Sequence, residues 1–102
     1  MFPGIWGAAC DYTNVIMKRE RLRRQNERKF VAWDELPDGG RRYFYEVQGR
    51  HGWSARYVKE VDDSEQTIKF YQEIYDDEGH LVEIHEKYPV NKGHIIVKGG
   101  KR

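Results

Sequence analysis

The sequence has little that would tie it to an oxidising compartment or to a membrane. Cys10 is the single cysteine among 102 residues, so no disulfide can form within the chain. No stretch is apolar for long enough to span a bilayer. The apolar residues 1–10 lack the basic region and the long apolar segment of a signal peptide. These absences predict a cytoplasmic protein that has no membrane as a partner.

Charge of one sign is also lacking, since the net charge is only +1. Nothing global therefore draws the chain to nucleic acid, and any such affinity must come from local patches. The sequence has no glycine-rich nucleotide loop, no serine nucleophile elbow and no Cys/His zinc motif, so we predict no cofactor. What is present is polar and aromatic: 34% of residues are charged and 14% are aromatic, and the aromatic content favours a folded chain over disorder.

The clearest structural signal is a hairpin near the C-terminal end. Thr67–Tyr75 and Leu81–Tyr88 alternate apolar and polar residues, which is the period of a strand with one buried face. Between them, Gly79 stands where a three-residue hairpin loop needs a left-handed backbone. A loop of this kind fixes the register and predicts that Tyr71 lies opposite His85.

The same register places like charges opposite each other, Glu73 against Glu83 and Lys69 against Lys87. Such pairs are destabilising on a sheet. Either each charge finds its opposite diagonally or on a neighbouring strand, or this face binds a ligand. A shift of register by one residue would move every side chain to the other face and would remove the argument.

The remaining elements are read from capping and alternation. A helix is predicted over residues 13–30, because Thr13 or Asn14 can cap it and helix-forming residues follow. Three further strands are predicted: Arg42–Gln48, Trp53–Val61 and the short edge strand His94–Val97. The predicted fold is therefore α+β, with an N-terminal helix packed on a four- to five-stranded antiparallel meander sheet.

One domain is expected from a chain of this length. We predict a single α+β domain over residues 12–98. The segment 1–11, which contains a proline and two glycines and has no clear period, is expected to be an irregular N-terminal arm. Residues 99–102 are expected to form a basic tail.

The candidate catalytic residues cluster on the predicted hairpin. His85 is suited to act as a general acid or base because imidazole exchanges protons near neutral pH. Lys87 would contact a phosphate oxygen, and Glu83 and Tyr71 would position the reacting groups. A base, an acid and a cation suit the metal-independent cleavage of RNA, in which the 2′-hydroxyl attacks the phosphate. A histidine on a polar strand face is also often simply exposed.

Basic side chains suggest where RNA or an acidic protein partner would bind. Arg19, Arg23 and Arg24 lie on one face of the predicted helix, and Arg56 and Lys69 add positive charge on the sheet. The alternative is a solvated helix face with no partner. Enzymatic activity is left open at this point.

Two further hypotheses from other classes remain. The first is a non-enzymatic interaction module that assembles through its sheet edge or an aromatic face, with a homodimer as one form. The second is a metal- or small-ligand-binding domain. The histidines and acids that would serve it, in a spacing that matches no known metal signature, are His80, His85 and His94 with Glu83 or Glu86.

The segments WSARYVKE and FYQEIYDDEGHLVEIHEKYP, with the GH that follows them, resemble a small family of uncharacterised prokaryotic proteins. The resemblance covers about residues 42–94 and implies no activity. At the level of the fold, a helix followed by a meander with a late His/Lys/Tyr cluster is similar to the RelE-like ribonuclease toxins. That similarity implies RNA cleavage. The chain departs from many such toxins in having one N-terminal helix where they have two.

Overall fold

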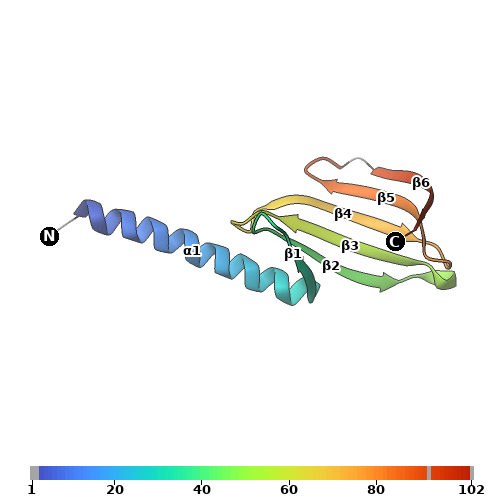
Figure 1. Cartoon of the computed structure of the whole chain (residues 1–102), viewed down its shortest axis with the longest axis horizontal. Helices are drawn as coiled ribbons and strands as arrows, with labels where there is room; N and C mark the ends of the chain where they lie inside the picture. The colour runs from blue at the N-terminus through green and yellow to red at the C-terminus, as the bar shows by residue number, and fades with distance from the viewer. Residues whose placement is uncertain (1–2, 92, 102) are drawn as a thin grey trace.

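The computed structural model describes the backbone of residues 3–91 and 93–101, and the side chains of residues 13–91 and 93–97. One helix is followed by six strands, and each strand pairs antiparallel with the next in the chain (Figure 1). The elements are α1 (Pro3–Phe30), β1 (Ala32–Glu35), β2 (Arg41–Gln48), η1 (Arg50–Gly52), β3 (Ser54–Val61), β4 (Thr67–Tyr75), β5 (His80–Tyr88) and β6 (Gly93–Lys101). The predicted α+β class, with an N-terminal helix on an antiparallel meander, is confirmed, and the sheet has six strands instead of four or five.

Both ends of the described chain are more regular than we expected. The helix begins at Pro3 and continues through most of the predicted irregular arm. Proline is tolerated in the first helical turn, because the N–H that it lacks would have no partner there. At the other end β6 extends to Lys101, which pairs with His80, so most of the predicted tail is a strand. Residues 1, 2 and 102 lie outside the described part.

The helix packs on the sheet with its C-terminal part only. In Figure 1 its N-terminal part projects beyond the ends of the strands. The radius of gyration is 18.3 Å, whereas a compact domain of this length would have about 13 Å. Val15 and Met17, in the projecting part, are each 62% exposed. Exposed apolar side chains are typical of interaction surfaces, and the interaction-module hypothesis stays a prediction.

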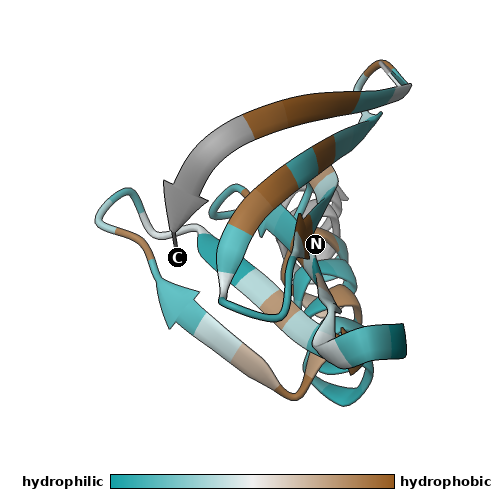
Figure 2. Ribbon diagram, turned by 90° about the vertical axis from the view of Figure 1, so that its right-hand side faces the viewer, coloured by the Kyte–Doolittle hydropathy of each residue, from teal (hydrophilic) through white to brown (hydrophobic). Residues whose placement is uncertain are grey.

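The core lies where the end of α1 meets the sheet. Phe30, Tyr43 and Val61 are fully buried there. The ring of Phe30 lies 5.7 Å from that of Tyr43 and 5.4 Å from that of Tyr45, between centroids. Viewed along the long axis, the strands curl instead of lying flat (Figure 2). The helix therefore covers one end of one sheet face and leaves the rest of that face open.

Four hairpin loops share one geometry. Each closes a five-residue turn in which the N–H of the first residue donates to the carbonyl of the fifth, at 2.8 to 3.0 Å. The fourth residue of each loop has a positive φ. These residues are Gly39, Gly52, Glu65 and Gly79. The role predicted for Gly79 is confirmed by its φ of 81°. Three loops use glycine, as this backbone conformation favours, and one uses a glutamate.

The predicted register of the β4–β5 hairpin is wrong by one residue. Tyr75 pairs with Leu81, but Ile74 pairs with Glu83, so Val82 is an extra residue that forms a β-bulge. Beyond the bulge Gln72 lies opposite His85, and Tyr71 is displaced to the opposite face. The predicted like-charge pairs do not form, and Glu73 lies opposite an isoleucine. A bulge of this kind leaves no reliable mark in a single sequence.

The helix ends at a strained residue, which gives a first prediction. Val31 has a φ of 70° and is 77% exposed. Its N–H donates to the carbonyl of Glu27 at 3.1 Å, as in a helix C-cap that usually carries glycine. We expect Val31→Gly to raise the free energy of unfolding by about 0.5–1 kcal/mol, because glycine adopts this conformation without strain. Urea denaturation measures the change, and a loss of stability would contradict the expectation.

Candidate active site

Two histidines on adjacent strands form the centre of the candidate site. His85 on β5 lies opposite His94 on β6, and their ring centroids are 4.2 Å apart at an angle of 43°. His94 Nδ1 lies 2.7 Å from a carboxylate oxygen of Glu83. The side chain of His94 is 45% exposed, so a ligand can reach the pair. The structure thus places the imidazole of His94 beside both Glu83 and His85.

Asn91 determines which nitrogen of His85 carries the proton. Its Oδ1 lies 2.7 Å from His85 Nε2 and also accepts the N–H of Gly93 at 3.0 Å. Because the backbone N–H can only donate, this atom of Asn91 is an acceptor, and His85 Nε2 is the donor. In neutral His85 the lone pair therefore lies on Nδ1. The ionised carboxylate of Glu83 can only accept a hydrogen bond, so His94 donates from Nδ1. The Nε2 of His94 is then available to a ligand.

Lys87 lies two residues beyond His85 on the same face. Its Nζ is 5.2 Å from the centroid of the Tyr57 ring and 5.9 Å from that of Phe70. Tyr57 stacks on Tyr45 at 5.0 Å with an interplanar angle of 18°. The hydroxyl of Tyr57 accepts a hydrogen bond from Gln72, the residue opposite His85. The Lys87 ammonium group therefore lies beside aromatic rings in the middle of the sheet, on the same face as the imidazole pair.

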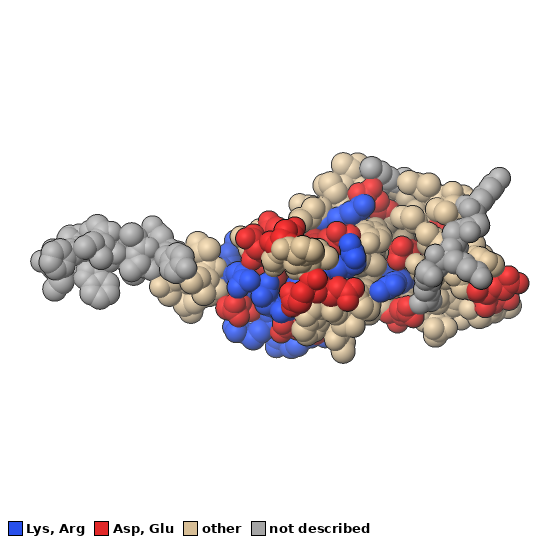
Figure 3. Space-filling view, in the orientation of Figure 1, with Lys and Arg blue, Asp and Glu red and all other residues tan. Residues whose placement is uncertain are grey.

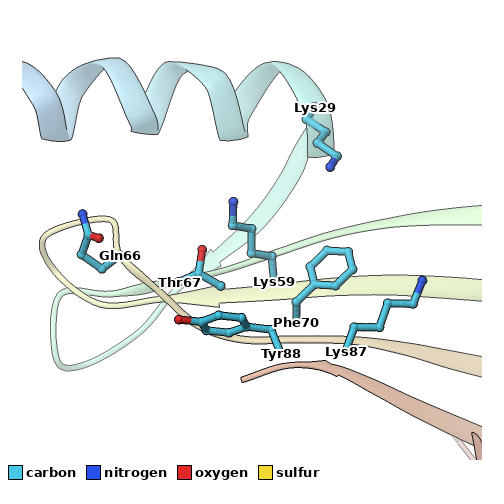
Figure 4. Close-up of a pocket in the computed structure, with 7 residues that line it drawn as sticks. All are labelled: Lys29, Lys59, Gln66, Thr67, Phe70, Lys87 and Tyr88. Atoms are coloured by element: carbon cyan, nitrogen blue, oxygen red, sulfur yellow. The ribbon is translucent and has the colours of Figure 1, made fainter. Parts of the chain in front are cut away.

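A cleft adjoins this surface under the end of the helix (Figure 4). Its volume is about 540 Å³. It is lined by Lys29, Lys59, Gln66, Thr67, Phe70, Lys87 and Tyr88. Burial and the nearby charge of Lys29 lower the pKa of Lys59 from its ordinary value. Burial is the larger cause of this shift, and the negative charge of Glu65 opposes it. Only Lys87 among these residues was a predicted site residue.

Tyr71 does not belong to this site. It lies opposite Glu86, and its hydroxyl donates to Glu60 at 3.2 Å. Burial, with the charges of Glu60 and Glu73, raises the pKa of Tyr71 to about 12. The side chain lines a smaller hollow of about 340 Å³. The proposed positioning role of Tyr71 beside His85 is therefore incompatible with the geometry.

Two of the predicted nucleic-acid-binding residues lie on the same far face as Tyr71. Arg56 stacks on Phe44, with its guanidinium carbon 4.3 Å from the ring centroid, and lines the smaller hollow. The Nζ of Lys69 lies 5.2 Å from the centroid of the Tyr71 ring. Both residues are separated from His85 by the thickness of the sheet, so neither can hold a phosphate beside it.

The three helix arginines have separate surroundings. Arg23 donates to the buried carboxylate of Glu65 at 3.0 Å and is part of the folded core. Arg19 donates to the backbone of Asp63 at 2.6 Å and pairs with Glu20. Arg24 is exposed. On the face seen in Figure 3, acidic side chains lie among the basic ones over α1 and the adjoining strands. The helix face that carries Arg19, Arg23 and Arg24 is thus not uniformly basic.

The described residues contain neither a cluster of metal-ligating side chains nor a membrane-spanning helix. No three His, Cys, Asp or Glu side chains within it are arranged to hold a metal ion. His80 lies at the far end of β5, where it contacts Asp76 and Glu78 at 3.5 Å each. Residues 3–91 and 93–101 contain no helix with the length and apolar character that a membrane crossing needs.

Comparisons with protein-family models, with curated proteins and with solved structures find no match to this chain.

Proposed function

We propose that this protein binds single-stranded RNA along the open part of the sheet face and cleaves it without a metal ion. The observation that carries the proposal is the pair of imidazoles, His85 and His94, with ring centroids 4.2 Å apart. Each ring is held by its own hydrogen-bond partner, and a lysine lies on the same face. This arrangement provides a base and an acid side by side and a cation on the same face.

The reaction is a transfer of the phosphoryl group within the RNA strand. Neutral His85 removes the proton of the 2′-hydroxyl through Nδ1, and the 2′-oxygen attacks the adjacent phosphorus. Protonated His94 gives its Nε2 proton to the departing 5′-oxygen. Its other nitrogen faces the Glu83 carboxylate, which balances the positive charge. The products are a 2′,3′-cyclic phosphate and a 5′-hydroxyl, and the two histidines have exchanged protonation states.

Lys87 stabilises the charge that develops on the phosphate oxygens. It lies two residues from His85 on one strand, a separation of about 7 Å. An ammonium group at that position contacts the scissile phosphate or the one next to it. Tyr45 and Tyr57, which stack on each other on the same face, offer a surface on which an RNA base can stack.

The test is a comparison of two labelled oligonucleotides that have the same sequence, one RNA and one DNA. We expect cleavage of the RNA alone, because DNA lacks the attacking 2′-hydroxyl. Cleavage should persist in EDTA and leave a 2′,3′-cyclic phosphate, detected by mass spectrometry. Equal cleavage of the DNA, or an RNA that stays intact at high protein concentration, would overturn the proposal.

A further inference from the structure

The cleft beneath the helix end gathers three lysine ammonium groups, none of which forms a direct ion pair among the described residues. Lys29, Lys59 and Lys87 reach it from α1, β3 and β5 (Figure 4). None of the ion pairs found among the described residues involves these lysines. The charge of Glu65 acts on Lys59, but its carboxylate bonds to core residues, and Glu27 pairs with Arg41 at 2.7 Å. Three ammonium groups around one cleft favour an anionic ligand.

The walls of the cleft are suited to a flat ring. The ring of Phe70 has the ammonium groups of Lys29 and Lys87 each 5.9 Å from its centroid. Tyr88, which also lines the cleft, is 47% exposed. Two aromatic side chains that line one cleft can stack with a ring in a ligand. Gln66 and Thr67 add an amide and a hydroxyl that can form hydrogen bonds with polar edges.

From these features we infer that the cleft is a binding site for one nucleoside phosphate. The phosphate lies among the three ammonium groups, and the base stacks against Phe70 or Tyr88. The volume of about 540 Å³ is within the range of about 300–1,000 Å³ common for small-molecule sites. The inference goes beyond RNA cleavage, because it needs no reaction and does not involve the imidazole pair. A free nucleotide or one nucleotide of a longer strand carries the same chemistry.

The experiment titrates the intact chain with 5′-AMP, with inorganic phosphate and with adenosine, each followed by NMR. We expect AMP to bind about tenfold more tightly than either of the other two, because it alone uses the cationic and the aromatic parts of the cleft. Shifted resonances should include those of Phe70, Thr67 and Tyr88. Phosphate binding as tight as that of AMP would refute the ring site, and a lack of AMP binding would refute the whole inference.

Variants separate the two parts of the site. Lys59→Gln and the exposed Lys29→Gln should each weaken AMP binding about tenfold. Tyr88→Ala should weaken the binding of AMP and leave that of phosphate unchanged. The matched control is Lys69→Gln, which removes a lysine from the opposite face and should have no effect. Lys59 also donates to Asn26 at 2.9 Å, so Lys29→Gln supplies the result if Lys59→Gln folds poorly.

The outcome is separable from that of the cleavage test. If AMP binds and RNA stays uncut, the inferred nucleotide site is supported and the cleavage proposal is overturned. If RNA is cleaved and AMP does not bind, the cleavage proposal is supported and the nucleotide site is overturned. Equal loss of AMP binding in Lys29→Gln and Lys69→Gln would show that only overall charge matters, which contradicts a defined site.

Discussion

Glu65→Ala is expected to lower the free energy of unfolding by about 3–5 kcal/mol, the range for removal of one partner from a buried charged network. The side chain of Glu65 is fully buried. Its carboxylate accepts hydrogen bonds from Tyr43, from Asn26 at 3.0 Å and from Arg23 at 3.0 Å. These bonds tie α1 to the sheet. Alanine would leave the three donors without their acceptor in a dry environment.

The position of Glu65 in its loop gives a sharper form of this experiment. Its φ is 67°, where the three equivalent loop residues are glycines. Glu65→Gly therefore removes the same hydrogen bonds as Glu65→Ala while relieving the backbone strain. We expect the glycine variant to be more stable than the alanine variant by about 1 kcal/mol and still well below the wild type. The comparison measures how much strain the buried carboxylate offsets.

A control on the surface distinguishes burial from simple loss of charge. Glu35 also contacts an arginine, Arg41, at 2.8 Å, but its side chain is 62% exposed. Glu35→Ala should lower stability by less than about 1 kcal/mol. Urea denaturation of all four proteins gives the values. A loss for Glu65→Ala no larger than that for Glu35→Ala would refute the structural role of the buried carboxylate.

The same network sets the pH dependence of stability. Burial alone would raise the pKa of Glu65, but hydrogen bonds from Tyr43, Asn26 and Arg23 outweigh it and lower the pKa from its ordinary value of 4.5. A carboxyl whose pKa is lower in the folded state stabilises the fold fully above pH 4.5, and that contribution falls as pH drops through the folded pKa. The stability difference between wild type and Glu65→Ala should therefore shrink in acid.

Tyr43, which donates a hydrogen bond to Glu65, sets the alkaline limit of the stabilisation by this network. Burial and the bond to Glu65 raise the pKa of Tyr43 from 10.0 to about 12. A group that holds its proton more tightly in the folded state contributes fully below pH 10.0 and loses that contribution as pH rises toward 12. The network is therefore expected to stabilise the fold most between these limits.

The sequence was informative where local patterns decide the structure. Alternating apolar residues predicted the central strands, and Gly79 predicted its loop, because both signals depend on a few neighbouring residues. The extra residue at Val82 was not predictable, since a bulge depends on how two strands fit together. That single insertion moved Tyr71 away from His85. Glu83 and His85 stayed on one face because both follow the bulge, and Lys87, at a second shift of register, still contacts Tyr57 and Phe70 on that face.

The parts of the site that depend on distant residues were missed for the same reason. Lys59 and Lys29 meet only when the helix end packs over the sheet, so no sequence spacing marks them. Asn91 orients His85 from a loop six residues away, and asparagine in a loop is usually a turn residue. Glu65 stands where the three other loops have glycine, and the buried donors around it explain that choice.

The histidine pair yields the second large effect. Alanine at His85 or at His94 is expected to reduce the rate of RNA cleavage by a factor of about 10²–10⁴, the usual contribution of a general acid or base. If the two imidazoles act in one reaction, the double variant should lose little more than either single variant. Additive losses would indicate that they act independently.

The pH dependence of cleavage tests the assignment of roles directly. A base that must be neutral and an acid that must be protonated give a bell-shaped profile. Without His85 the limb that rises with pH should disappear, and without His94 the limb that falls should disappear. His80→Ala is the matched control, because that histidine lies at the other end of the same strand, beside Asp76 and Glu78. Its substitution should change neither the rate nor the profile. A similar loss in all three variants would trace the activity to folding or to a contaminant, since His80 is too far along the strand to reach the same phosphate.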